Sequence, residues 1–217
     1  DQKGRTTSWS EISSFTTGLI DEADWHNALW IGYEDISKEK RMVPGIHHNG
    51  DNLGDLCMDR PVVPYLRKEF KIDRKVSGAT LFITGLGHYE AFINGNKVGK
   101  GFLTPGWTNY DKTVLYNIYD VTSMLQQGSN VIGAIVGNGF YNINRERYRK
   151  LVIAFGTPLL LAQLRIHYSD GSEEILVTDT DWETAPSPII YTSIFGGEDY
   201  DARLEQPGWN QPGFDDS

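Results

Sequence analysis

The stretch His88-Tyr-Glu-Ala-Phe-Ile-Asn-Gly-Asn-Lys-Val98 places strand-forming residues on both sides of an Asn-Gly pair. Asn94 and Gly95 both tolerate positive φ, which a type I′ turn needs at its two central positions. The pattern therefore predicts a tight antiparallel hairpin in this part of the chain.

The chain around this hairpin has the two-residue period of β-strands from Tyr65 onward. Residues 130–136 are apolar almost throughout, which indicates a strand buried on both faces. One short helical turn is predicted over 122–128, started by Asp120 or Thr122 and stopped by Gly128. The sequence predicts an all-β fold, an antiparallel jelly-roll β-sandwich over residues 64–217 with about eight to ten short strands. The other predicted strands are 65–72, 79–84, 114–121, 159–168 paired with 174–178 across Asp170-Gly171, 181–182, 189–194 and 200–204.

The part of the chain before the sandwich divides into two segments. Residues 1–20 are polar with spaced aromatics and are too few to bury a core, so we interpret them as the C-terminal strand or strands of a preceding β module. Residues 21–63 form an irregular insert or extended linker. Trp25 and Trp30 are expected to pin this connector onto the sandwich. Because the chain starts at Asp1 without a Met, we interpret it as a fragment.

Bulk properties exclude several classes of function. A net charge of −9 opposes nucleic-acid binding, and the cluster Arg145, Arg147, Arg149 and Lys150 is too short to offset it. Cys57 is the only cysteine, so the chain can form no internal disulfide. Its longest apolar runs are far below the ~20 residues that cross a bilayer, so no membrane partner is expected. The pairs of glycines at 85–87 and 137–139 open no helix, so a nucleotide site is not predicted.

Two loops carry the side chains that sugars require. The stretch Phe102-Leu-Thr-Pro-Gly-Trp-Thr-Asn-Tyr-Asp111 delivers a flat indole, an amide and a carboxylate to one turn, and Gly137–Tyr148 is rich in amides and phenols. Aromatic faces pack on sugar C–H groups, while amides and carboxylates bind vicinal hydroxyls. The competing interpretation is that these residues only anchor the loops. The candidate carbohydrate-binding residues are Trp107, Asn109, Asp111, Asn138, Tyr141 and Asn142.

The stretch Gly196–Arg203 concentrates carboxylates. Glu198, Asp199 and Asp201 are candidate Ca²⁺ ligands because hard cations prefer oxygen. In an extended strand Asp201 and Arg203 would share a face, so an internal ion pair explains them equally well. No second segment supplies the partner acid of a glycosidase pair. The spacing of six further possible ligands matches no zinc pattern; these are His47, His48, Asp51, Asp55, Cys57 and Asp59.

Several ordered motifs resemble the N-terminal β-sandwich region of bacterial α-L-rhamnosidases, glycoside hydrolase family 78. They are Gly85-Leu-Gly-His-Tyr-Glu90, Ile93-Asn-Gly-Asn-Lys-Val98, Trp107-Thr-Asn-Tyr-Asp-Lys112, Ile118-Tyr-Asp-Val-Thr122, Gly137-Asn-Gly-Phe-Tyr141 and Gly196-Gly-Glu-Asp-Tyr-Asp-Ala-Arg203. The resemblance covers about residues 25–217 and is weakest over 32–63. Residues 8–19 also resemble the closing strand of a fibronectin-like module.

The resemblance implies a parent enzyme that hydrolyses terminal α-L-rhamnose with carboxylates on a downstream (α/α)₆ barrel. It further implies that this chain alone is inactive and that some related sandwiches bind rhamnose with Ca²⁺. We therefore expect a non-catalytic accessory domain that assists recognition of a rhamnose-containing glycan, with a purely structural module bracing the barrel as the alternative. A periplasmic or secreted location is expected for the parent protein.

Overall fold

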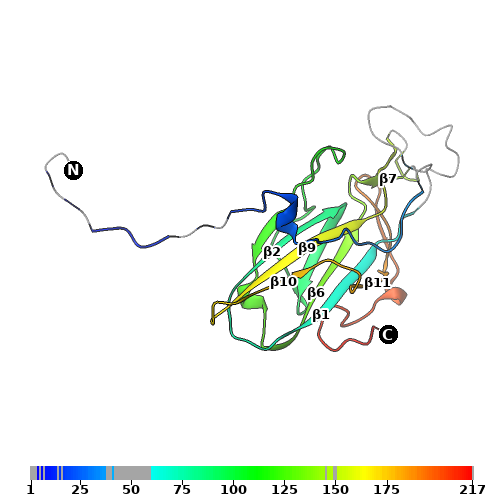
Figure 1. The fold of residues 1–217 in the computed structure, drawn as a ribbon. Helices are drawn as coiled ribbons and strands as arrows, with labels where there is room; N and C mark the ends of the chain where they lie inside the picture. Colours follow the sequence, from blue (N-terminus) through cyan, green and yellow to red (C-terminus); the bar gives the residue numbers. More distant parts are fainter. Residues whose placement is uncertain are drawn as a thin grey trace.

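The computed structural model describes residues 4, 6, 8–13, 15, 17–37, 41, 60–144, 146–148 and 151–216. Two antiparallel β-sheets pack face to face and form a sandwich (Figure 1). The first sheet has five strands in the order β11 (Glu183–Pro186), β1 (Pro64–Ile72), β6 (Gly128–Gly137), β3 (His88–Ile93) and β4 (Asn96–Lys97). The second has four strands in the order β10 (Glu173–Val177), β9 (Leu159–Tyr168), β2 (Val76–Leu86) and β5 (Asn117–Asp120). The predicted antiparallel β-sandwich is confirmed.

Smaller elements decorate this sandwich. Two-stranded sheets pair β7 (Asn142–Ile143) with β8 (Ile153–Ala154) and β12 (Ile189–Ser193) with β13 (Gly197–Tyr200). The described residues also contain the 3₁₀ turns η1 (Glu22–Trp25), η4 (Thr122–Met124) and η5 (Ala202–Leu204). No helix among the residues described is long and apolar enough to cross a bilayer.

The predicted hairpins are present because their turn residues adopt the required backbone. Asn94 and Gly95 have φ of 50° and 80°, and Ile93 pairs with Asn96 across them. Gly171, with φ of 84°, closes the turn between β9 and β10. Both hairpins are therefore specified by a few neighbouring residues.

Three predicted strand boundaries need correction. The strand expected over 114–121 is formed only over Asn117–Asp120, and the one expected at 181–182 begins at Glu183. The strand expected over 200–204 ends at Tyr200, where the Asp201 carboxylate accepts a hydrogen bond from the backbone N–H of Arg203 and starts η5. The side-chain hydrogen bond of Asp201 thus takes the place of backbone hydrogen bonds between strands at this point.

The hydrophobic core fills the space between the two sheets. Alternate residues of β2 and β9, such as Leu81 and Leu160, face β6 residues such as Ile132, and all are at most 1% exposed. The opposite face of β6 is covered as well, because Trp209 stacks on Tyr65 at 4.2 Å and lies against Gly133. The prediction that β6 is buried on both faces is confirmed.

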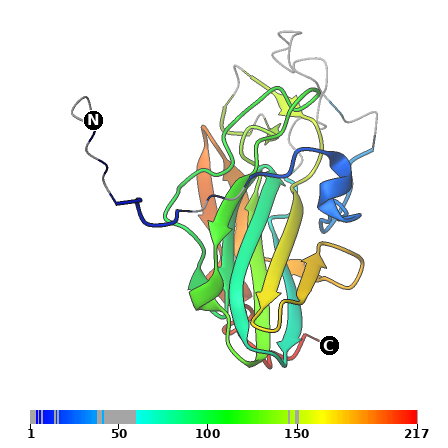
Figure 2. The same ribbon diagram turned by 60° about the vertical axis from the view of Figure 1, so that its left-hand side comes forward.

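The connector before the sandwich lies on the four-stranded sheet. The Trp25 ring makes an edge contact with Tyr116 at 5.5 Å, and Ile31 forms a β-bridge with Leu160. The described residues between 8 and 20 form no strand and extend away from the sandwich (Figures 1 and 2). Their assignment to a preceding module stays a prediction.

The fit of Trp209 over Gly133 can be tested with two glycine variants. A Cβ at Gly133 would lie 2.7 Å from the Trp209 ring, whereas a Cβ at Gly78 would meet nothing within 4 Å. We expect Gly133→Ala to lower the free energy of unfolding by about 1–3 kcal/mol, since overpacking forces the ring aside. Gly78→Ala should leave it within about 1 kcal/mol of the native value. Urea unfolding followed by circular dichroism measures both, and equal effects would contradict this packing.

Candidate functional site

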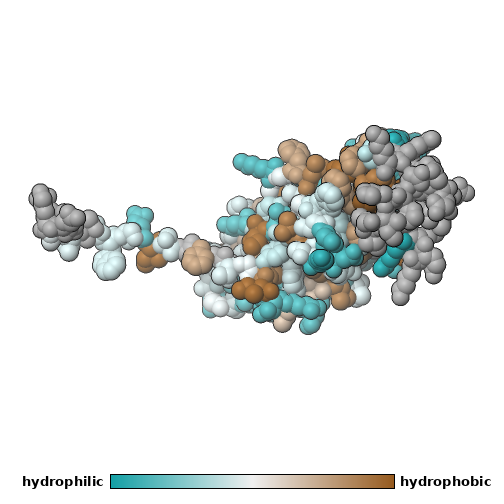
Figure 3. All heavy atoms as spheres, turned by 90° about the horizontal axis from the view of Figure 1, so that it is seen from above, coloured by the Kyte–Doolittle hydropathy of each residue, from teal (hydrophilic) through white to brown (hydrophobic). Residues whose placement is uncertain are grey.

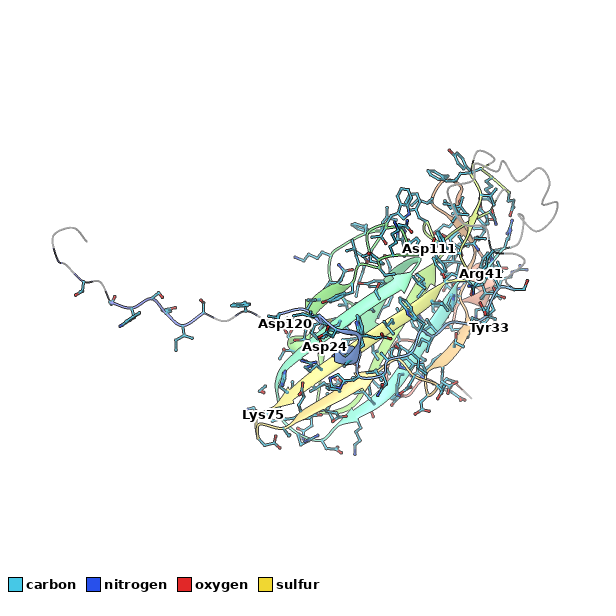
Figure 4. The ribbon with its side chains drawn as sticks, turned by 45° about the horizontal axis from the view of Figure 1, so that its top comes forward. Asp24, Tyr33, Arg41, Lys75, Asp111 and Asp120 are labelled. Carbon is cyan, nitrogen blue, oxygen red and sulfur yellow. The ribbon has the colours of Figure 1, made fainter. Side chains whose placement is uncertain are left out.

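Three polar segments meet at one end of the sandwich. His88 pairs with Gly137 and Leu86 with Leu159, so β2, β3, β6 and β9 have ends at the same level. The loop 99–116, the loop 138–158 and the β12–β13 hairpin extend from this end (Figure 2). Asp111 lies there, whereas Lys75 lies at the opposite end (Figure 4). Strand register therefore gathers segments that are up to about a hundred residues apart.

The loop that carries Trp107 is held by backbone and amide hydrogen bonds. Tyr89 N–H donates to the Thr104 carbonyl, which ties the loop to β3. The Asn109 carbonyl accepts from the N–H groups of Lys112 and Thr113, and its Oδ1 accepts from Asp111 N–H at 3.1 Å. This Asx-type turn fixes the local position of Asn109 relative to Asp111.

A cavity of about 380 Å³ opens beside this turn. It is lined by Trp107, Thr108, Asn109, Asp111 and Phe155. Trp107 is 58% exposed and stacks on Phe140 at 4.5 Å, so the indole is held while one side stays open. Among the described residues none forms a side-chain hydrogen bond or ion pair with the Asp111 carboxylate. Three of the six predicted carbohydrate-binding residues thus share one cavity.

Tyr141 lies behind the wall of this cavity. Its ring stacks on Phe155 at 5.6 Å and makes an edge contact with Tyr110 at 5.2 Å. Burial raises the pKa of the Tyr141 phenol, and burial raises the pKa of Tyr110 to about 12. Both phenols are protonated at neutral pH, so they brace the wall without adding charge.

The two predicted asparagines of the second loop are buried. Asn138 is 3% exposed and donates its Nδ2–H to the Thr192 carbonyl, which ties the loop to β12. Asn142 is 5% exposed and donates to the Gly156 carbonyl. Buried amides of this kind satisfy backbone groups. Their contact with a sugar stays a prediction, and Trp107, Asn109 and Asp111 are the predicted residues that line a cavity.

The carboxylates predicted to bind calcium are not brought together. Asp199 accepts hydrogen bonds from Arg147 at 2.5 Å, and Asp201 accepts from the Nε–H of Arg203 at 2.8 Å. The bonds from Arg203 lower the pKa of Asp201 to about 2. Glu198 is exposed on the other side of the strand. In the described part of the chain no group of three His, Cys, Asp or Glu side chains could hold a metal ion, and the assignment of calcium to these residues stays a prediction.

An unpredicted cluster joins the loop 138–158 and the β12–β13 hairpin to Arg60, which precedes β1. The Tyr191 ring lies between two guanidinium groups, Arg60 at 4.9 Å and Arg147 at 4.4 Å. Asp199 contacts both arginines, and Glu146 accepts from Arg60 Nε–H at 2.7 Å. We call these five residues the arginine clamp. Its members are up to 139 positions apart (residues 60 and 199), so no short sequence pattern predicts the arginine clamp.

Two sets of predicted residues lie outside the described residues. They are Arg145, Arg149 and Lys150 of the basic cluster, and the six possible zinc ligands His47, His48, Asp51, Asp55, Cys57 and Asp59.

Comparison of the sequence with known proteins identifies the family of this chain. Residues 74–217 match the family described as the alpha-L-rhamnosidase N-terminal domain. An alpha-L-rhamnosidase of Formosa agariphila is 34% identical over 221 residues, which cover 100% of this chain and 23% of that protein. An alpha-L-rhamnosidase of Streptomyces avermitilis is 46% identical over 158 residues, 70% of this chain and 15% of that protein. The chain thus spans less than a quarter of these relatives.

Solved structures give the same result. The alpha-L-rhamnosidase of Aspergillus terreus aligns with a TM-score of 0.75 at 37% identity, covering 98% of this chain and 23% of that one. The Streptomyces avermitilis enzyme, complexed with L-rhamnose, aligns with a TM-score of 0.65 at 42% identity, covering 72% of this chain and 15% of that one.

The arginine clamp makes stability depend on pH in a definite direction. Hydrogen bonds from Arg147 lower the pKa of Asp199, and hydrogen bonds from Arg60 lower the pKa of Glu146. Groups with a depressed folded-state pKa stabilise the fold above their unfolded pKa of about 4, and this contribution is lost as pH falls through the folded value. We expect the urea midpoint to fall less steeply between about pH 5 and 3 in Asp199→Asn/Glu146→Gln than in the native chain. Parallel pH profiles would contradict the clamp.

Proposed function

Because this chain belongs to the family of α-L-rhamnosidase N-terminal domains, we propose that it is the non-catalytic accessory domain of a larger rhamnosidase-like glycoside hydrolase. In this proposal the domain binds the rhamnose end of a glycan at the cavity beside Trp107. The downstream catalytic barrel of the same polypeptide carries the hydrolysis. The observation that carries the proposal is the meeting, in one cavity, of an open indole face with a carboxylate that no described side chain pairs.

The chemistry of the cavity suits a 6-deoxy sugar. The Trp107 face can pack on C–H groups of the ring and on the methyl group that distinguishes rhamnose. The Asp111 carboxylate can accept hydrogen bonds from two neighbouring hydroxyls, and the Asn109 amide can donate to one of them. The solved Streptomyces avermitilis relative is a complex with L-rhamnose, which makes this sugar the first ligand to test.

Hydrolysis by this chain alone is not part of the proposal. A glycosidase needs a protonated carboxyl held in an environment that raises its pKa, facing a second carboxylate. The side chain of Glu90 is 50% exposed and forms an ion pair with Lys97. Asp199 and Asp201 have lowered pKa values. Asp199 and Asp201 therefore favour the ionised form, which cannot protonate a leaving group.

The alternative function is a purely structural module that braces the catalytic barrel. The buried amides of Asn138 and Asn142 favour it, since both satisfy the backbone of the sandwich itself. In that case the cavity beside Trp107 would receive no sugar. The two functions therefore differ in a direct binding measurement.

Calorimetric titration with L-rhamnose, with and without calcium, tests the proposal. We expect binding at concentrations up to roughly 10 mM, weakened at least about tenfold by Asp111→Asn because a charged hydrogen bond contributes about 1.5–3 kcal/mol. Trp107→Ala should weaken it by a similar factor through loss of stacking. Asp73→Asn, at an exposed site, is the matched control and should bind as the native chain does. The absence of heat from the native chain would favour the structural module.

A second experiment tests which part of the polypeptide hydrolyses the rhamnoside. The isolated chain should release no product from an aryl α-L-rhamnoside, whereas the full-length protein should. Turnover by the isolated chain would overturn the assignment of hydrolysis to the remaining polypeptide.

A further inference from the structure

A second cavity, of about 560 Å³, opens at the same end of the sandwich. It lies over the outer face of β3 and β6, with the β12–β13 hairpin and residues 102–103 beside it. Val63, Ile135 and Ile189 contribute apolar surface to it. The polar side chains that line it are His88, Glu90, Thr192, Ser193 and Glu198.

The polar lining of this cavity suits hydroxyl groups. Ser193 is 6% exposed, and its Oγ has no hydrogen-bond partner in the described structure. Burial lowers the pKa of His88, so its imidazole is neutral at pH 7. The charged residues among the described lining of either cavity are carboxylates, Asp111 in the first and Glu90 and Glu198 in the second. These charges disfavour an anionic ligand.

A row of aromatic rings runs between the two cavities. Trp107 stacks on Phe140 at 4.5 Å, Phe140 meets Phe195 edge-on at 5.9 Å, and Tyr148 stacks on Phe195 at 4.4 Å. We call these four side chains the aromatic ridge. Trp107 lines the first cavity, and Phe140 makes an edge contact at 6.3 Å with His88, which lines the second.

Two rings of the aromatic ridge are exposed, and Phe140 and Tyr148 are half-buried. Trp107 is 58% exposed and Phe195 is 46% exposed, although stacked rings of this size are usually buried. Phe102 and Leu103 add exposed apolar surface at the lip of the second cavity. Seen from above, hydrophobic residues lie in several places on the surface among polar ones (Figure 3). Two exposed rings in a row of stacked aromatics beside two polar cavities form a surface more extended than one sugar requires.

We infer that this end of the sandwich binds a linear oligosaccharide of neutral sugars. The terminal rhamnose occupies the first cavity, the following sugar packs on the aromatic ridge, and a more distant sugar enters the second cavity. This inference rests on the proposed function, because the ridge extends the site beside Trp107. The inference adds to the proposed function the class of ligand, which is an extended neutral oligosaccharide rather than a single sugar.

Titration with two ligands distinguishes a site for an extended oligosaccharide from a site for a single sugar. The probes are L-rhamnose and a neutral tetrasaccharide ending in α-L-rhamnose. We expect the native chain to bind the tetrasaccharide at least about tenfold more tightly, since the two cavities act as linked sites. Phe195→Leu and Glu198→Gln should each remove most of this gain and leave L-rhamnose affinity within about twofold. Phe195→Leu keeps apolar volume in the ridge, so its fold should be intact.

The controls distinguish failure of the inference from failure of the proposed function. Ile118→Ala changes an exposed apolar residue on the other sheet and should affect neither ligand. Asp111→Asn should weaken both ligands. Equal affinities that Phe195→Leu and Glu198→Gln leave unchanged would overturn the inference while the proposed function stands. Failure of both ligands to bind would overturn the proposed function and the inference together.

The charge of the ligand is tested with a tetrasaccharide in which uronic acid replaces the inner neutral sugars. We expect it to bind at least about tenfold more weakly than the neutral chain, because Glu90 and Glu198 repel its carboxylates. Equal or tighter binding would overturn the assignment to neutral sugars.

Discussion

The close approach of Trp209 to Gly133 determines which part of the outer face of the five-stranded sheet the C-terminal segment covers and which part stays open. A hydrogen in place of a side chain at Gly133 lets the indole lie on β6, where it also stacks on Tyr65 and meets Phe92 edge-on at 5.7 Å. The segment that follows carries Asp216, which pairs with the buried Arg67. The C-terminal segment therefore covers one half of this face. The other half, over Val63 and Ile135, remains open as the second cavity.

The elements that could be predicted from sequence are those specified by neighbouring residues. Asn94-Gly95 and Asp170-Gly171 identify their hairpins because positive φ is a property of the turn residues themselves. The turn of Asn109 and Asp111 is equally local, since the Asn109 side chain accepts from a backbone group two residues on. Sequence therefore grouped Trp107, Asn109 and Asp111 correctly on one loop, and their contact with a sugar stays a proposal. It did not identify η5, where the capping of Asp201 competes with strand extension.

The rest of this end of the sandwich depends on contacts between residues far apart in the sequence, and no short sequence pattern predicts such contacts. Phe140 and Phe195 are 55 positions apart and meet where Asn138 and Arg147 tie their loop to the β12–β13 hairpin. In sequence Asn138 resembles a residue that binds hydroxyls, because an amide that braces a backbone and one that contacts a ligand look identical. Burial distinguishes them, and burial is set by the packing of all three segments. The aromatic ridge and the arginine clamp were missed for this reason.

The same distinction applies to the carboxylates at this end of the sandwich. Asp199 and Asp201 each have an arginine partner, so their charge is already compensated within the fold. Asp111 accepts no such bond from the described residues and lies beside an open indole face. A solvated carboxylate loses water when a ligand approaches and must regain those hydrogen bonds from the ligand. In the proposed function, vicinal hydroxyls on a ring that can stack would provide both contacts at once, and for this reason the proposal centres on Asp111 rather than on the acid-rich strand.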